Sequence, residues 1–232
     1  MSQSVYQRVL GDEFAALTPE LQRYFGMPDA GSHGEGTGVF EVAGPAHRWL
    51  WPLFWVFAGE QILFPEYGRN VPFEVVNQPA GEALRATRVF HFAEQSARPR
   101  RATMTGRPVE PNRAGKPRDR VIVDEMRVID GVLHDFLGKH NRLEVALRLS
   151  VADGRLAMVS TGAWLWFGSR RVRLPALLSA RVVLTEQWED DHQRVSVALR
   201  HPLLGEVFVY RGMFDYRWVN DGRPAEADLP KE

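Results

Sequence analysis

Four ionisable side chains that could transfer protons lie in segments where apolar and polar residues alternate: Arg88, His91, Glu125 and Glu186. Because side chains alternate between the faces of a strand, only one of the adjacent Asp124 and Glu125 can point to a buried face. A carboxyl or imidazole group in an apolar cavity has a shifted pKa. An inward carboxylate needs a partner, for which Arg88 is the natural candidate. The pattern permits general acid–base chemistry, and structural ion pairs or outward charges are the alternative.

Other kinds of catalytic site find little support. The chain has no cysteine, which excludes disulfides, thiolate nucleophiles and cysteine metal ligands. It has no Gly-x-Ser-x-Gly or Ser-x-x-Lys motif, and the glycine-rich stretch 31–38 does not follow a strand as a nucleotide-binding loop would. His134 and His140 lack a usual ligand spacing, and the acidic stretch 189–192 fits a hairpin turn. We therefore predict no metal site and no cofactor.

The most apolar stretch, HRWLWPLFWVFAGEQILFP at 47–65, holds three of the seven tryptophans. It is too short to cross a membrane, which takes about 20 apolar residues, and Pro52 interrupts it. Trp51 and Trp55 are four residues apart and share one face of a helix. We expect both to be buried against the concave face of a sheet. The same tryptophans could instead form ordinary core.

The elements that must position these residues are mainly strands. Residues 4–26 are predicted to form short helices, and Pro45 opens the apolar helix. After residue 60 the sequence alternates with a period of two, and Asp130-Gly131 marks a hairpin. We predict a mainly β (α+β) fold. Its sheet would be a strongly curled antiparallel sheet or open β-barrel of about ten strands. N-terminal helices would accompany it, with the apolar helix packed on the concave face.

One segment interrupts the strands. Residues 94–119 are rich in Pro, Gly and Arg and are predicted to form a flexible basic loop within a single domain, 1–232. The loop could hold an anion or could simply be solvated, and the sequence leaves both open.

The balance of charge limits the possible partners. Lys and Arg equal Asp and Glu in number, 29 each, so the whole protein has no field that would attract nucleic acid. The first residues lack the basic and apolar regions of a signal peptide, and we expect a soluble cytoplasmic protein without a transmembrane segment. A homodimer could cover exposed apolar edges.

The string HPLLGEVFVYRGMFDY resembles the closing motif of a bacterial family known as domain of unknown function 4166. The matching residues are Pro202, Leu203, Leu204, Gly205, Tyr210 and Gly212. YQRVLGDEFAALTPELQRYFG resembles the opening of that family, and VRLPALLSARV resembles its link between late strands. Arg88 and Phe90 match a middle-strand motif, in which Ala86 replaces a tryptophan. The resemblance implies one domain and transfers no activity.

Three functions follow from these patterns. The first is binding of a hydrophobic small molecule or lipid in an apolar cavity of the curled sheet. The second is a small-molecule isomerase or cyclase that uses acid–base residues in the same cavity. The third is a peripheral membrane or protein-interaction module that exposes the apolar helix. The residues expected to contact a ligand are Trp51, Trp55, Arg88, His91, Glu125, Trp166, Glu186 and Tyr210.

Overall fold

The computed structural model describes residues 3–93 and 118–220, and eleven strands run through them. The strands are β1 (Ser32–Pro45), β2 (Gly68–Ala80), β3 (Ala83–Phe92), β4 (Arg118–Ile129), β5 (Val132–Leu137), β6 (Leu143–Ala152), β7 (Arg155–Phe167), β8 (Arg170–Arg173), β9 (Arg181–Glu189), β10 (His192–His201) and β11 (Gly205–Asn220). Most of the predicted loop 94–119 lies outside the described residues, and β4 already begins at Arg118.

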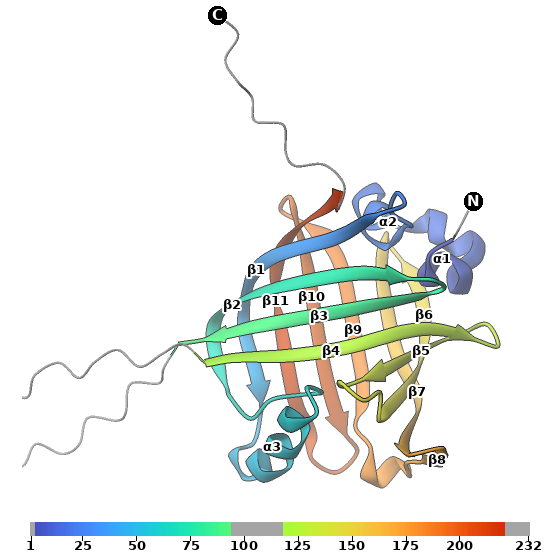
Figure 1. Ribbon diagram of the computed structural model, residues 1–232. Helices are drawn as coiled ribbons and strands as arrows, with labels where there is room; N and C mark the ends of the chain where they lie inside the picture. Colours follow the sequence, from blue (N-terminus) through green and yellow to red (C-terminus); the bar gives the residue numbers. More distant parts are fainter. Residues whose placement is uncertain (1–2, 94–117, 221–232) are drawn as a thin grey trace, which may run out of the picture.

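All the strands belong to one antiparallel sheet with the order β6-β5-β4-β3-β2-β1-β11-β10-β9-β7-β8. Because β6 also pairs with β7, ten of them close into a barrel, and β8 is attached to β7 as a short extra strand (Figure 1). The predicted mainly β fold with N-terminal helices is confirmed, and the barrel is closed rather than open. Closure removes the free edges that an open sheet would present.

Tight hairpins connect several strands, as the Asp-Gly pairs predict. Asp130 and Gly131 join β4 to β5 with φ angles of 51° and 77°. Asp153 and Gly154 join β6 to β7 with φ angles of 51° and 75°. Two consecutive positive φ angles are typical of the type I′ turn, whose twist matches that of the flanking strands. The turn residues therefore fix where these strands end.

Helices cover both ends of the barrel (Figure 1). The α1 end carries α1 (Val5–Leu10), the 3₁₀ helix η1 (Gly11–Ala16) and α2 (Pro19–Phe25), whereas the α3 end carries η2 (Arg48–Leu50), α3 (Trp51–Gly59) and η3 (Ala176–Leu178). Ser4 caps α1, since its hydroxyl accepts the Gln7 N–H at 3.1 Å and its own N–H donates to the Gln7 side chain at 2.9 Å. Among the described residues, no helix is long and apolar enough to cross a membrane.

Helix α3 lies across its end of the barrel and buries only one of its sides. Leu50 and Phe54 reach the core, with Phe54 3% exposed, whereas Trp49 is 63% exposed and Trp55 49% exposed. Trp51 is half-buried. The expected burial of Trp55 is wrong, because a short helix across an opening presents a single stripe to the interior. Its indole instead lies against the Arg120 guanidinium, 4.9 Å from the ring centroid.

The barrel interior contains two apolar clusters. The first joins α3 to strands β1 to β4, β10 and β11, and Phe40 and Phe73 stack there with ring centroids 3.8 Å apart. The second joins α1 and α2 to strands β4 to β7, with Leu133 and Leu156 fully buried. Such interiors pack as densely as organic crystals. Polar side chains that point inward therefore stand out, and several lie between the two clusters.

A close approach of β1 and β11 helps to close the barrel. Phe40 on β1 is paired with Gly212 on β11. A Cβ atom on Gly212 would lie 2.1 Å from the carbonyl oxygen of Val39 and 2.6 Å from the Cα of Phe40. Only glycine fits there without separating the strands. This accounts for the glycine of the Tyr-x-Gly motif.

Candidate functional site

Ionisable side chains from five strands point into the barrel. Arg88 lies on β3, Asp124 on β4, Asp135 on β5, Glu186 on β9 and Tyr210 on β11. Each belongs to the inward-facing set of its strand because its cross-strand partners are core residues. We call these five residues the interior polar cluster. The alternation of each strand thus places charge where the surroundings are apolar.

Arg88 and Asp124 form the ion pair of this cluster. The Arg88 guanidinium donates a hydrogen bond to the Asp124 carboxylate. Burial alone would lower the pKa of Arg88, but Asp124 and the other nearby acidic groups raise it well above its ordinary value, so Arg88 stays charged. Burial in turn raises the pKa of Asp124, against the effect of Arg88. Such a pair is costly to bury and costly to break.

Among the described residues, no arginine or lysine forms such a pair with the other two carboxyl groups, those of Asp135 and Glu186. Burial raises the pKa of Asp135 well above its ordinary value, and the neighbouring Asp124 raises it further. Burial also raises the pKa of Glu186 to about 7, although a hydrogen bond from Gln193 and the charge of Arg88 oppose the shift. Both carboxyl groups therefore hold a proton more readily than in water, and at neutral pH Glu186 is near its titration midpoint.

Two carboxyl oxygens of the cluster lack protein donors. Among the described residues, neither Asp124 Oδ2 nor Asp135 Oδ1 has a hydrogen-bond partner, and both atoms are buried. A buried acceptor without a donor costs about 1–3 kcal/mol. Such a cost is typical of positions that a proton, a water molecule or a ligand satisfies. The cluster therefore offers acceptors to a group that brings its own hydrogen-bond donors.

Two tyrosines from the N-terminal helices close the cluster at the α1 end. The Tyr6 hydroxyl donates to the sulfur of Met126 at 3.2 Å, and the Tyr24 hydroxyl accepts from Asn77 at 3.4 Å. Burial raises the pKa of both tyrosines well above the ordinary value, and the charge of Glu186 adds to the effect. Both phenols therefore stay neutral, and uncharged aromatic groups cover the cluster at the α1 end.

Some inward-facing side chains on the opposite side of the cluster keep accessible surface. Arg88 points inward, yet 20% of its side chain is accessible. Four leucine and valine side chains pack against both core clusters and still keep accessible surface: Leu137, Leu143, Val182 and Leu184. These residues lie on the α3 side of β5, β6 and β9, so the accessible surface lies toward the α3 end.

The structure brings together three of the residues expected from the sequence: Arg88, Glu186 and Tyr210. Glu125 lies on the outer face instead, where Arg85 donates to its carboxylate at 2.6 Å and Arg127 also pairs with it. Asp124, its neighbour in the sequence, is the inward member of the pair. Burial acts to raise the pKa of Glu125, but the hydrogen bonds from Arg85 and Arg127 and their charges together lower it. Glu125 is therefore part of a structural ion pair on the outer face of the barrel.

Three other expected residues line an open cleft outside the barrel. Trp51, Trp55 and His91 border a cleft of about 630 Å³ between α3 and the ends of β2 and β3. The His91 Nδ1 atom lies 2.8 Å from a carboxylate oxygen of Asp119, and its Nε2 lies 3.7 Å from Glu74. This cleft is therefore separate from the interior polar cluster.

Trp166 belongs to a further outer group. Its indole N–H donates to Glu144 at 2.8 Å, and the same carboxylate is bonded to His134 at 2.7 Å and to two guanidinium nitrogens of Arg171 at 2.9 and 2.5 Å. The Arg171 guanidinium also lies 4.0 Å from the centre of the Trp164 ring. Because every oxygen of Glu144 is satisfied, this group is built to hold β5, β6, β7 and β8 together.

Sequence reasoning missed Asp135 and Gln193, although a signal was present. Asp135 stands between Leu133 and Leu137 at spacings of two, and a strand places all three on one face. Gln193 stands in the same way before Val195. A polar residue within an apolar i, i+2 series marks an inward polar group. Within residues 3–93 and 118–220, no group of three or more His, Asp or Glu side chains is placed to hold a metal ion.

Comparisons with known proteins agree with the resemblance seen in the sequence. A family model described as "Domain of unknown function (DUF4166)" matches residues 17–111 and 112–214. "Uncharacterized protein YndH" of Bacillus subtilis (strain 168) is 26% identical over 226 residues, which cover 91% of this chain and 96% of that protein. No solved structure matches the chain.

Proposed function

The chain belongs to the family described as domain of unknown function DUF4166, and on the geometry of its barrel we propose that it binds a small, mainly apolar molecule with a cationic or hydrogen-bond-donating group. The observation that carries this proposal is the imbalance of the interior polar cluster. Three carboxyl groups share one guanidinium, that of Arg88, and the oxygens Asp124 Oδ2 and Asp135 Oδ1 have no donor among the described residues.

The surroundings of the cluster support an apolar body for this molecule. The Tyr210 ring lies 5.1 Å from that of Phe40 and 5.7 Å from that of Phe90, measured between centroids. Aromatic walls with a few convergent polar groups are typical of small-molecule sites, and the faces of such rings attract cations. A barrel of this strand number can enclose one small ligand.

Two matched fluorescent probes would test the proposal: a dansyl-labelled fatty amine and a dansyl-labelled fatty acid of the same chain length. We expect the wild-type protein to bind the amine more tightly than the acid. Asp135→Asn should weaken amine binding, since it removes a carboxyl group that can pair with the ammonium. Glu125→Gln is the control, because it removes a carboxylate on the outer face. Equal binding of the two probes, or equal effects of the two variants, would count against this function.

A second candidate is proton-transfer catalysis at the interior polar cluster, as in an isomerase or cyclase. The raised pKa of Glu186, about 7, favours it, because a general acid or base works best when its pKa is near the working pH. The carboxyl groups of Glu186 and Asp135 would then move the protons. Small molecules that copurify with the wild-type protein would be the reaction product, whereas those that copurify with Glu186→Gln would be the unreacted substrate. Chromatography and NMR should therefore show that the two extracts differ in structure. Identical compounds from both proteins would oppose catalysis.

Three further expectations stay predictions: that residues 1–232 act as one domain, that the protein works in the cytoplasm, and that it forms a homodimer. Limited proteolysis, cell fractionation and analytical ultracentrifugation, in that order, would measure them. A stable fragment smaller than the barrel, a membrane-bound or exported protein, or a monomer at all concentrations would contradict the respective prediction.

A further inference from the structure

The α3 end of the barrel is a continuous surface built from four parts of the chain. We call residues 45–59, 138–143, 167–181 and 200–205 the α3-end surface. They contain η2 and α3, the connection between β5 and β6, the segment that holds β8 and η3, and the turn between β10 and β11. Figure 1 shows α3 and β8 on the same side of the barrel.

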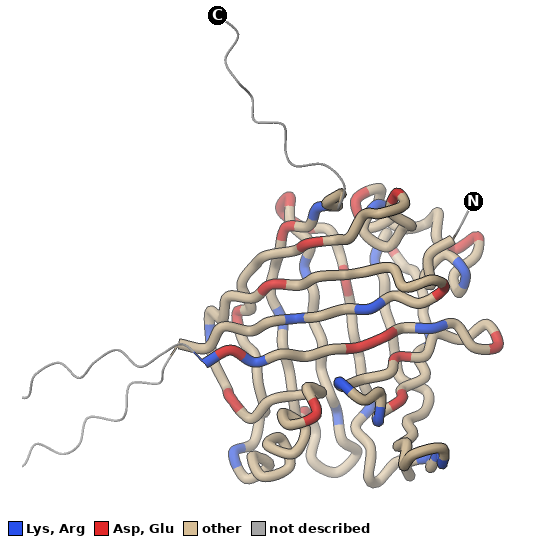
Figure 2. Tube along the Cα trace, viewed as in Figure 1, with Lys and Arg blue, Asp and Glu red and all other residues tan. Residues whose placement is uncertain are grey.

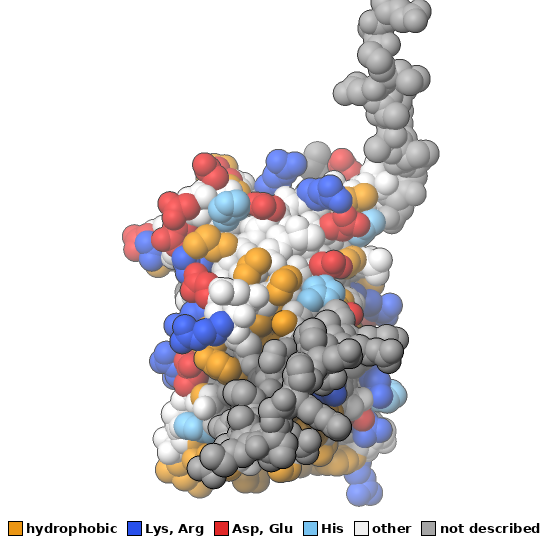
Figure 3. Space-filling model, turned by 90° about the vertical axis from the view of Figure 1, so that its left-hand side faces the viewer, with side chains coloured by type: hydrophobic (Ala, Val, Ile, Leu, Met, Phe, Trp, Pro, Cys, Tyr) orange, Lys and Arg blue, Asp and Glu red, His pale blue; other side chains and the backbone are white. Residues whose placement is uncertain are grey.

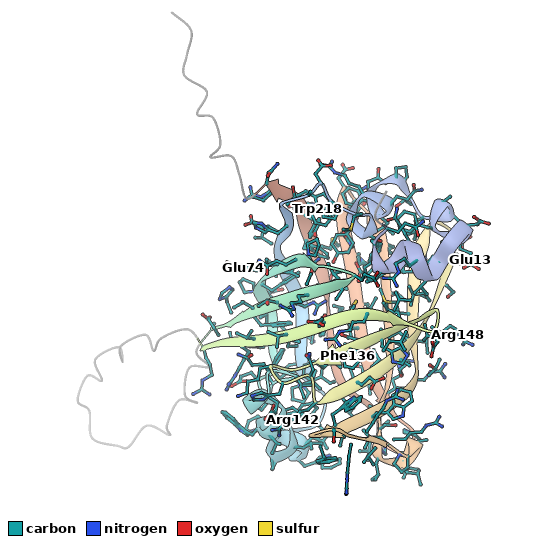
Figure 4. The ribbon with its side chains drawn as sticks, turned by 45° about the vertical axis from the view of Figure 1, so that its right-hand side comes forward. Glu13, Glu74, Phe136, Arg142, Arg148 and Trp218 are labelled. Carbon is teal, nitrogen blue, oxygen red and sulfur yellow. The ribbon has the colours of Figure 1, made fainter. Side chains whose placement is uncertain are left out.

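Polar contacts join these parts in sequence around the end. Glu60, which follows α3, pairs with His140 at 2.9 Å and with Arg142 at 3.7 Å. The backbone N–H of Trp166 donates a hydrogen bond to the backbone carbonyl oxygen of Arg142 at 2.8 Å. Figure 4 shows Arg142 beside α3. The first three parts of the surface are therefore fixed relative to one another.

Two histidines join the fourth part of the surface, the turn between β10 and β11, to the other parts. The His201 Nε2 atom lies 2.9 Å from the carbonyl oxygen of Leu177, and the His47 Nε2 atom lies 3.3 Å from that of Leu204. His47 also stacks on Trp49 with ring centroids 6.0 Å apart. The turn between β10 and β11 is thus joined to η3 on one side and to η2 on the other.

Three of the four parts of this surface expose large apolar side chains, which we call its apolar tips. Leu203 is 76% exposed, Leu178 73%, Val56 66%, Phe167 64% and Trp49 63%. Figure 3 shows hydrophobic side chains gathered along the lower edge of the molecule, which is the α3 end. Single exposed apolar residues are ordinary, but a contiguous group marks a surface that contacts a partner or a membrane.

The charge of the same surface has one sign. Its four parts contain eight Lys and Arg residues and no Asp or Glu, in a protein whose formal net charge is zero. Two acidic residues border it: Glu60 is paired with His140 and Arg142, and Glu206 lies 3.8 Å from Arg211. The hairpin turns at the α1 end carry the opposite charge, with Glu82, Asp130, Asp153 and Asp190. Figure 2 shows Asp and Glu at hairpin turns on the side of α1, and some also beside α3. The surface as defined is thus basic, with Glu60 and Glu206 at its border.

We propose that the α3-end surface docks onto an anionic phospholipid bilayer. The tryptophan and leucine tips would enter the boundary between headgroups and acyl chains, and the arginines would pair with lipid phosphates. The short strand β8 suits this contact, because all four of its residues are exposed and three of them are arginines. A second copy of the chain is disfavoured, since two identical basic surfaces repel each other.

Cosedimentation with vesicles tests this proposal. The full chain should bind phosphatidylcholine vesicles that contain phosphatidylglycerol and bind vesicles of pure phosphatidylcholine far less, and added salt should weaken the binding. Each arginine near such a surface contributes about fivefold to the affinity. Arg170→Gln/Arg173→Gln should therefore bind about 25-fold more weakly. Leu177→Ser/Leu178→Ser should also lose binding, by removal of the apolar tips.

The matched control is Arg148→Gln/Arg155→Gln, which removes two exposed arginines from β6 and β7 outside this surface. Figure 4 shows Arg148 away from α3. The control should bind anionic vesicles like the wild type, and all variants should keep the wild-type melting temperature. Equal binding to both kinds of vesicle, or equal losses in control and test variants, would overturn the proposal. So would a dimer in analytical ultracentrifugation that Leu177→Ser/Leu178→Ser abolishes while vesicles are not bound.

Discussion

The side-chain amide of Gln193 on β10 donates a hydrogen bond to the carboxyl group of Glu186 on β9, inside the barrel. Glu186 lies between the two apolar clusters, opposite Val195 on one side and Leu156 on the other. Burial holds the pKa of Glu186 at about 7, above its ordinary value of 4.5. Folding therefore favours the protonated form of this carboxyl group, and the stability of the protein must depend on pH.

The first prediction concerns that dependence. Below pH 4.5 Glu186 is protonated in both states, and between pH 4.5 and about 7 only the unfolded state is ionised, so the free energy of unfolding falls as the pH rises. At about 1.4 kcal/mol per pH unit, the contribution of Glu186 amounts to roughly 3 kcal/mol. Glu186→Gln should lose this part of the slope in urea titrations at several pH values. Glu20→Gln, an exposed change on α2, should keep the wild-type slope.

The second prediction concerns the buried pair of Arg88 and Asp124. Arg88→Met should lower the free energy of unfolding by about 3–5 kcal/mol, because it leaves Asp124 buried without its cation. The double variant Arg88→Met/Asp124→Leu should be more stable than Arg88→Met alone, since both charges are gone. Chemical denaturation of Arg88→Met, of Asp124→Leu and of the double variant gives the coupling energy. If the two single effects simply add, the pair is not coupled as the structure implies.

The third prediction separates two aromatic residues of α3. Phe54 packs on Phe208 with ring centroids 5.3 Å apart and is buried. Phe54→Ala should therefore lower stability by about 3–5 kcal/mol. Trp55 is half exposed and contacts Arg120, so Trp55→Ala should cost below about 1 kcal/mol. Thermal unfolding of both variants is the measurement. A larger loss for Trp55→Ala than for Phe54→Ala would mean that α3 is turned the other way.

The fourth prediction concerns the contact between β1 and β11. Gly212→Ala should cost about 1–3 kcal/mol, because the new methyl group would meet the backbone of Val39 and Phe40. Gly59→Ala at the end of α3 is the matched control, since a Cβ there would meet nothing within 4 Å. The control should keep its melting temperature. A melting temperature of Gly212→Ala equal to that of the control would show that the two strands can separate at little cost.

Much of this fold can be predicted from the sequence because its signals are local. The period-two alternation and the turn at Asp130-Gly131 locate strands and hairpins, and Pro19 marks the start of α2. Closure of the barrel is a different matter, because it depends on the pairing of β1 with β11 from opposite ends of the chain. No local pattern specifies such a contact, so an open and a closed sheet have the same signature.

The site was predicted only in part for the same reason. Alternation shows that Asp124 and Glu125 face opposite ways, but not which of them faces inward, and that depends on the pairing with β3 and β5. The prediction for the tryptophan-rich stretch was wrong for a different reason. From Trp49 to Ala58 it has no polar residue, so it contains no information on which side of the helix meets water. The orientation of Trp55 therefore had to come from the structure.

The opposite charges at the two ends of the barrel also have a consequence for motion. A molecule with zero formal net charge does not migrate in a uniform electric field, but one that is basic at one end and acidic at the other is an electric dipole and rotates to align. Close to a negatively charged plane, the torque turns the α3 end forward within a Debye length of about 8–10 Å. Encounters that begin with the α3 end forward are therefore favoured over the opposite orientation.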